Sequence, residues 1–186
     1  QHKPVIHPQP VLEPDSLVDG AGCSMYGTVL RDSGLLRMWY QAWPKNWNGE
    51  NAELIGYAES DDGIVWRRPK LGLMDCGGRE NNLVDLNGHP PTIFIDPDAP
   101  PSHRYRATMW TDAKGAKALK QGLKGSGYYT AHSADGIHWT YDQDTPRWQG
   151  SDVITSAYHP GQRRGIVALK YSPFVNGIPR RSIWMA

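Results

Sequence analysis

The feature that most constrains the fold is a seven-residue pattern, Ser-x-Asp-Gly-x-x-Trp, which occurs at residues 60–66 and again at residues 133–139. Asp-Gly suits a tight turn, because Gly tolerates positive φ and an Asp side chain accepts hydrogen bonds from nearby backbone amides. The closing Trp of each copy would lie on the following strand and pack between adjacent sheets. Turn chemistry therefore accounts for both aspartates, and the repeat indicates a structural module rather than a reactive site.

Short strand-like runs stand around each copy of the motif, separated by Gly and Pro residues that favour turns. In the first module these runs lie at residues 25–32, 34–43, 52–60 and 64–69. In the second module they lie at residues 92–96, 104–110, 127–133 and 137–142. A third, incomplete copy has runs at residues 151–160, 163–171 and 180–186. We align the first two modules by three residue pairs: Thr28 with Thr92, Trp39 with Trp110, and Ser60 with Ser133.

Four-stranded modules that recur along a chain are typical of a β-propeller, in which each module forms one blade. We therefore predict an all-β chain with blades of four antiparallel strands, in a single and partial propeller domain over residues 1–186. The modules would span about residues 20–80, 85–148 and 150–186. Two and a half blades cannot close a ring, and three alternatives follow: missing C-terminal blades, self-association with another chain, or an open arrangement of modules.

Composition limits the classes of partner. Twenty basic and nineteen acidic side chains nearly cancel, which argues against a nucleic-acid binder. No apolar run approaches the roughly 18 to 20 residues of a membrane helix. Eight Trp and nine Tyr stand against two Phe, and their flat faces with a polar edge suit sugar rings as well as protein cores. The start at Gln1 fits a secreted or periplasmic protein after processing, or a trimmed chain, and we expect export.

Five stretches carry a resemblance to a known family: "GLLRMWYQAW", "YAESDDGIVWRRPKLGL", "ENNLV", "IDPDAPPSHRYRATMW" and "AHSADGIHWT". From about Gly20 to Ala186 the chain resembles the five-bladed propeller superfamily of arabinanases, levansucrases and invertases. It is most similar to little-characterised secreted members related to glycoside hydrolase families 43 and 32. The resemblance implies a propeller that hydrolyses a polysaccharide or oligosaccharide by acid–base chemistry. The alternative is a non-catalytic carbohydrate-binding or scaffold propeller, because fold does not determine activity.

Members of this superfamily place acidic residues in a central funnel, at the innermost strands of the first three blades. Glycoside cleavage uses such acids in pairs, one to protonate the leaving oxygen and one to activate water or attack the sugar. Asp19, Asp85 and Asp152 each stand just ahead of an expected innermost strand, so the resemblance suggests them as catalytic residues. Solvated turn acids are the structural alternative. A Glu on the third blade, the family's usual general acid, is not apparent.

Four further residues are candidates for substrate binding. His89 would lie beside Asp85 at the funnel mouth, and Asn82 could orient a substrate or cap a turn. Trp43 and Trp47 fall in a long connection and could stack on a sugar ring. We expect no cofactor and no metal site; a structural calcium ion would suit such a funnel, but the sequence does not indicate one. Cys23 and Cys76 could form one disulfide or remain two buried thiols.

Overall fold

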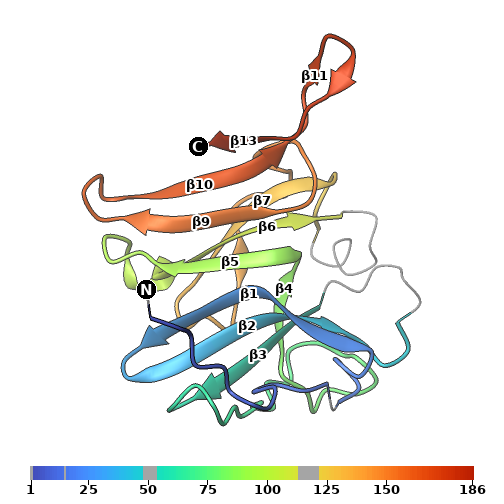
Figure 1. Cartoon of the computed structure of the whole chain (residues 1–186), viewed down its shortest axis with the longest axis vertical. Helices are drawn as coiled ribbons and strands as arrows, with labels where there is room; N and C mark the ends of the chain where they lie inside the picture. The colour runs from blue at the N-terminus through green and yellow to red at the C-terminus, as the bar shows by residue number, and fades with distance from the viewer. Residues whose placement is uncertain (1, 15, 48–53, 113–121) are drawn as a thin grey trace.

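The computed structural model describes residues 2–14, 16–47, 54–112 and 122–186, and these form strands joined by turns (Figure 1). The first sheet contains four antiparallel strands in chain order: β1 (Gly22–Asp32), β2 (Leu35–Trp43), β3 (Leu54–Ser60) and β4 (Leu83–Asn87). The second sheet repeats this plan: β5 (His89–Ile95), β6 (Tyr105–Thr111), β7 (Gly127–Ser133) and β8 (Thr140–Tyr141). A 3₁₀ turn, η1 (Pro101–His103), precedes β6.

A third sheet has three strands in the spatial order β13-β10-β9: β9 (Ile154–His159), β10 (Arg164–Tyr171) and β13 (Ser182–Met185). A small hairpin of β11 (Phe174–Val175) and β12 (Ile178–Pro179) projects beyond it. The all-β prediction is confirmed. A propeller requires a closed ring of blades, and the described sheets do not form one. The five-bladed propeller and its module boundaries therefore stay predictions. Within the described ranges, no helix has the length and apolar character needed to cross a membrane.

The opening strand of each sheet lies beside that of the next, so that β1, β5 and β9 run side by side through the middle of the molecule (Figure 1). We refer to these three as the first strands. The Thr28 hydroxyl donates to the Pro91 carbonyl at 3.3 Å and accepts the Ile93 N–H at 2.9 Å. The Thr92 hydroxyl donates in turn to the Ile154 carbonyl at 3.1 Å. Two aligned threonines thus join successive first strands in the same way.

The repeated motif forms the predicted turn at the end of the third strand of each sheet. In the first copy, Ser60 Oγ accepts the Gly63 N–H at 2.8 Å, and Asp62 Oδ1 accepts the N–H groups of Ile64 and Val65 at 2.8 and 2.9 Å. The second copy repeats these bonds at 2.8, 2.8 and 2.9 Å, between Ser133 and Gly136, Asp135 and Ile137, and Asp135 and His138. Both glycines have positive φ, +85° and +76°. Side-chain capping of backbone amides therefore fixes both turns.

Two details of the alignment are wrong. Residues 64–69 do not form the fourth strand: only a single bridge pairs Arg67 with Glu59, and β4 takes that place in the sheet. The same capping bonds precede β8 in the second sheet, so the difference lies in β4, which pairs with β3 at Leu54 and Gly56 and supplies the fourth strand. Trp39 corresponds to Thr108 rather than Trp110, because Thr28 pairs with Trp39 whereas Thr92 pairs with Thr108. Alignment of one Trp with another therefore places Trp39 opposite a residue two positions too far along β6. Predicted residues 52 and 53 lie outside the described ranges.

We expect the second turn to lose stability in acid. Burial raises the pKa of Asp135, but hydrogen bonds from His138 and Ile137 outweigh this effect and bring the pKa down to about 2. A carboxyl with a depressed folded-state pKa stabilises the fold fully above its unfolded pKa, near 4, and this contribution is lost as the pH falls toward 2. Because the side chain is about half exposed, we expect a change of about 1 kcal/mol.

Urea unfolding of wild type and Asp135→Asn at pH 6 and pH 2.5 measures this contribution. The wild type should lose more stability than the variant on acidification, while Asp61→Asn, which removes an exposed neighbour in the first motif, should follow the wild type. Equal losses in the wild type and Asp135→Asn would contradict the assignment.

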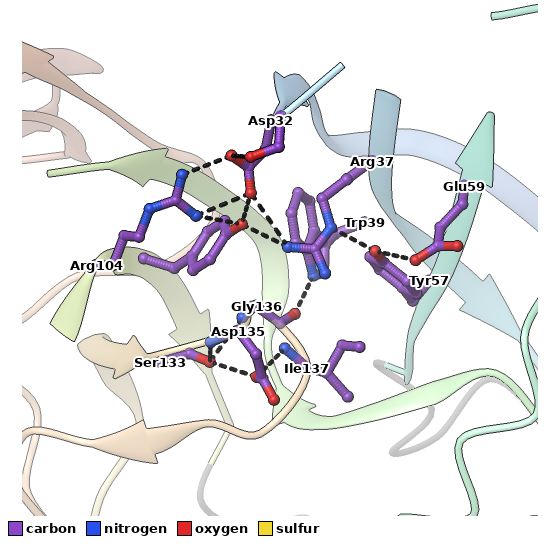
Figure 2. A network of polar contacts seen from close by, with 12 residues as sticks. Asp32, Arg37, Trp39, Tyr57, Glu59, Arg104, Ser133, Asp135, Gly136 and Ile137 are labelled. Atoms are coloured by element: carbon purple, nitrogen blue, oxygen red, sulfur yellow. Dashed lines mark hydrogen bonds and ion pairs between the residues drawn. The ribbon is translucent and has the colours of Figure 1, made fainter. Parts of the chain in front are cut away.

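A polar network joins the first and second sheets (Figure 2). Arg37 Nε donates to the Tyr57 hydroxyl and Nη1 to the Tyr105 hydroxyl, both at 2.5 Å. Asp32 holds Arg104 through two contacts of 2.5 and 2.8 Å and accepts the Tyr105 hydroxyl. These bonds hold the pKa of Asp32 well below its usual range, the largest effect being the hydrogen bond from Arg104.

The aromatic core lies beside this network. The rings of Trp39, Tyr57 and Tyr105 are fully buried or nearly so, and the Arg37 guanidinium lies 5.2 to 5.6 Å from their centroids. Trp39 Nε1 donates at 2.7 Å to the Gly136 carbonyl in the second motif turn, as Figure 2 shows. The motif of the second module is therefore packed against the first sheet.

The outward faces of the first and third sheets differ. The outward face of the first sheet is buried under the N-terminal segment and the connection between β3 and β4. Cys23 and Cys76 both pack there as thiols, so of the two alternatives the disulfide is not formed. The third sheet instead exposes apolar side chains, among them Ile183 and Met185, at 75% and 67% exposure.

Candidate functional site

A polar cluster lies where the first strands begin, and we call it the first-strand mouth: Tyr26, Gln41, His89, Asp152 and Lys170. Two β-bulges shape it, because the pairing register shifts between Ser24 and Thr28 in β1 and between His89 and Thr92 in β5. A bulge bends a strand and re-aims its side chains, and such irregularities are common beside functional sites. The bulges make His89 and the half-exposed Tyr26 neighbours on adjacent strands.

His89 is held from two sides. Its ring meets the Tyr26 ring edge-on, with centroids 5.2 Å apart and planes at 82°. Its Nδ1 lies 3.2 Å from Oε1 of Gln41, a residue of β2 with no exposed surface. Burial lowers the pKa of His89, and the nearby negative charge of Asp152 opposes this effect only in part. A pKa below the ordinary value of the imidazole favours the neutral form of His89 at pH 7.

Asp152 completes the mouth from the segment that enters β9. Its Oδ2 accepts a hydrogen bond from Lys170 Nζ on β10 at 2.5 Å. The hydrogen bond from Lys170 is the main reason that the pKa of Asp152 lies below its ordinary value, and His89 and Arg181 also act in that direction. The residue has φ of +82°, a conformation that is uncommon for a side-chain-bearing residue and often marks a functional position.

Trp43 and Trp47 lie near the same end of the first sheet. Trp43 pairs with Gly22 at the start of β1, and it points to the same face of β2 as Gln41, two residues earlier. The two indole centroids are 6.0 Å apart, and Trp47 is 43% exposed. The two rings are tilted by 43° to each other, so the exposed part of Trp47, rather than the pair as one plane, offers a flat face for a ring-shaped ligand near the mouth.

Asp19 and Asn82 lie on the opposite face of the first sheet. Asp19 is fully buried, pairs with Arg68 at 3.1 Å, and accepts the Tyr40 and Ser16 hydroxyls at 3.0 and 2.6 Å. Asn82 donates to the same Tyr40 hydroxyl at 2.9 Å. Tyr40 and Gln41 are successive residues of one strand, so their side chains point to opposite faces. The structure therefore does not bring Asp19 or Asn82 to the mouth.

Asp85 lies on β4, the edge strand of the first sheet, rather than directly ahead of β5. Its Oδ1 accepts the Trp139 N–H at 2.8 Å, and burial raises its pKa. It lines a cavity of about 420 Å³ together with Trp139, Tyr141 and Asp144. Asp152, one of the three predicted acids, acts electrostatically on the predicted site residue His89. The catalytic roles of all three stay predictions.

Tyr26, Gln41 and Lys170 belong to the mouth but were not predicted. Gln41 carried a usable signal, because it is an amide within the apolar run "LLRMWYQAW", and buried amides need partners. Tyr26 and Lys170 carried no such signal. Tyr26 reaches His89 only because both strands are bulged, and strand registers do not follow from composition.

No protein-family model matches the chain. Two uncharacterized proteins of Mycobacterium tuberculosis, from strains CDC 1551 / Oshkosh and ATCC 25618 / H37Rv, are each 31% identical to it over 117 residues. The aligned part covers 61% of this chain and 32% of each relative. The match thus spans about one third of the relatives' own length.

Two solved structures share the fold. One, named "Glycoside hydrolase", has a TM-score of 0.54 at 12% identity and covers 86% of this protein and 52% of that structure. The other, a BT0996 RGII complex, has a TM-score of 0.53 at 12% identity, with coverage of 93% and 56%. Similarity at this identity shows the fold alone. The protein therefore has a glycoside-hydrolase-like fold and spans about half the length of these two structures.

Proposed function

We propose that this chain is part of a glycoside-hydrolase-like, five-bladed β-propeller that binds a polysaccharide or oligosaccharide at the first-strand mouth and hydrolyses it by acid–base chemistry. The observation that carries the proposal is that Gln41 of β2 contacts His89, whose pKa is affected by the charge of Asp152, and that Trp43 and its neighbour Trp47 follow Gln41 closely in the chain. Sugar sites combine a flat aromatic surface with a few convergent polar groups. The exposed apolar face of the third sheet supports a further sheet packing there, as ring closure requires.

In this proposal Asp152 supplies the carboxylate, which activates water or stabilises positive charge on the sugar. His89, whose pKa is affected by the charge of Asp152, is a second group able to exchange a proton. The proposal also places the protein outside the cytoplasm, in the periplasm or the medium, which cell fractionation tests.

One observation favours a non-catalytic carbohydrate-binding protein as a second candidate. Glycoside hydrolysis ordinarily uses two carboxyl groups across the scissile bond. Of the three acids considered, Asp19 is enclosed beside Arg68 and Asp85 lies on the edge strand β4. A mouth that takes one carboxylate from the described part of the chain suits binding as well as catalysis.

Release of reducing ends from soluble arabinan and levan distinguishes the two candidates. If the protein is a hydrolase, Asp152→Asn should lower the rate by a factor of about 10² to 10⁴, the usual contribution of an acid–base group. Trp47→Ala should weaken retention on the same polysaccharides about tenfold, because it removes the exposed stacking face.

Asp98→Asn is the matched control, since Asp98 pairs with Arg163 beyond the far end of β5 and should leave the rate unchanged. Asp19→Asn and Asp85→Asn test the other two predicted acids. Retention without product release would select the binding protein, and full activity of Asp152→Asn would refute the proposed hydrolytic role.

A further inference from the structure

We propose that Gln41 is a positioning residue, which holds His89 as the neutral tautomer with its proton on Nδ1 and leaves Nε2 as a hydrogen-bond acceptor at the first-strand mouth. This tautomer follows from the geometry of the two side chains alone. Its meaning for a sugar ligand rests on the proposed function.

The orientation of the Gln41 amide is fixed first. Gln41 has no exposed surface, so both ends of its amide need partners within the protein. Its Nε2 donates at 3.3 Å to the Leu54 carbonyl. A carbonyl oxygen can only accept a hydrogen bond, so the NH₂ end of the amide must face Leu54. The remaining atom, Oε1, is the one that faces His89, and an amide oxygen can only accept.

The proton on His89 is then determined. Nδ1 lies 3.2 Å from that oxygen, so Nδ1 must carry the hydrogen and donate it. In a neutral imidazole with its proton on Nδ1, Nε2 carries a lone pair and acts as an acceptor. The partner of one ring nitrogen thus sets the tautomer of the whole ring. Within the described part of the chain, no hydrogen bond engages Nε2. Among the described residues, Tyr26 contacts the His89 ring, and Asp152, which is itself paired with Lys170, acts on it electrostatically.

This arrangement narrows the class of ligand. The Nε2 lone pair and the Asp152 carboxylate are both acceptors, so they suit a ligand that presents hydroxyl donors, as a neutral sugar does. Lys170, the cation of the mouth, is already engaged by Asp152, so a uronic acid or sulfated sugar would meet the Asp152 carboxylate and gains nothing from an unprotonated imidazole. Together with the exposed face of Trp47, the mouth is therefore built for a neutral glycan.

Nitrogen NMR of ¹⁵N-histidine-labelled full chain tests the tautomer without any ligand. Long-range ¹H–¹⁵N correlations separate a protonated from an unprotonated ring nitrogen, and the His89 signals are assigned by their loss in His89→Asn. At pH 8 we expect a protonated-type Nδ1 and an unprotonated-type Nε2. A proton on Nε2, or rapid exchange between both tautomers, in the wild type overturns the proposal whether or not any variant folds.

Gln41→Met removes the acceptor while keeping a side chain of similar length, and it should convert the His89 signals to a mixture of tautomers. Gln41→Glu keeps an acceptor in place and should retain the proton on Nδ1. An unchanged single tautomer in Gln41→Met would show that another group fixes the ring and would overturn the role of Gln41.

A glycan array of neutral and acidic oligosaccharides tests the proposed class of ligand. Two variants are matched, because Gln places an amide near the position of Nε2 and Asn near that of Nδ1. His89→Gln should retain more binding to neutral glycans than His89→Asn, and preference for acidic glycans would contradict the ligand class. The expected tautomer with no glycan bound defeats the proposed function but not the role of Gln41. The wrong tautomer with glycan binding defeats only the inference.

Discussion

Gly27→Ala is expected to destabilise this protein by more than about 3 kcal/mol, because the β1 bulge leaves no room for a side chain. A Cβ atom at this position would lie 1.9 Å from the Trp39 carbonyl oxygen and 3.1 Å from the Tyr40 Cα, which are backbone atoms of the paired strand β2. Backbone in the centre of a sheet cannot turn aside as a flexible side chain can. Relief therefore requires β1 and β2 to separate, at a cost above the 1–3 kcal/mol typical of overpacking.

Urea unfolding followed by Trp fluorescence measures this loss, with Gly161→Ala as the matched control. Gly161 lies in the exposed β9–β10 turn, where an added Cβ meets only the edge of the His159 ring at 3.2 Å. The control should stay within about 0.5 kcal/mol of the wild type. A Gly27→Ala protein within about 1 kcal/mol of the wild type would show that β1 does not approach β2 so closely. His89 and Tyr26 should also separate in the variant, since the same bulge positions Tyr26.

Arg37→Met is expected to lower the free energy of unfolding by about 3 kcal/mol. The Arg37 side chain is 11% exposed and donates to the hydroxyls of Tyr57 and Tyr105 while lying 3.8 Å from Asp32. Met retains an apolar stem of similar length, so the loss comes from the charge and its hydrogen bonds rather than from a cavity. Removing one partner from a buried charged network leaves the others incompletely compensated, which typically costs 3–5 kcal/mol. We expect the lower end, because Arg104 still pairs with Asp32.

The control is Arg31→Met, which removes an exposed guanidinium that donates to the Gly34 carbonyl of its own hairpin. It should change stability by less than about 0.5 kcal/mol. Equal effects of Arg31→Met and Arg37→Met would mean that the network in Figure 2 contributes no more than a surface charge.

The sequence was sufficient for features whose chemistry is local. The turn at Ser133, Asp135 and Gly136 could be predicted because capping groups and capped amides lie within a few residues of one another. The β1–β2 hairpin also followed from a local turn and its flanking apolar runs. The same reasoning failed for β4, since the strand that pairs with β3 at a sheet edge is chosen by packing and not by distance along the chain.

The candidate site was less predictable for the same reason. The sequence places three acids ahead of strand-like runs: Asp19, Asp85 and Asp152. The surroundings of such a residue, however, depend on the face of the sheet to which its side chain points. A one-residue difference along β2 separates the Asp19 side of the first sheet, at Tyr40, from the His89 side, at Gln41. Bulges add a second uncertainty, since they change side-chain direction without a clear mark in the sequence.

The bond from Trp39 to the Gly136 carbonyl has a thermodynamic consequence. That carbonyl also accepts the indole N–H of its own module's Trp139, at 3.1 Å, so one peptide group serves two sheets. Unfolding of the second turn alone would therefore leave the buried Trp39 indole of the first sheet without its hydrogen-bond acceptor. Unfolding of the first sheet would in turn expose the second turn to solvent. Coupling between neighbouring modules makes the unfolding of repeated structures cooperative. The first two sheets should consequently behave as one unit that is either formed or lost.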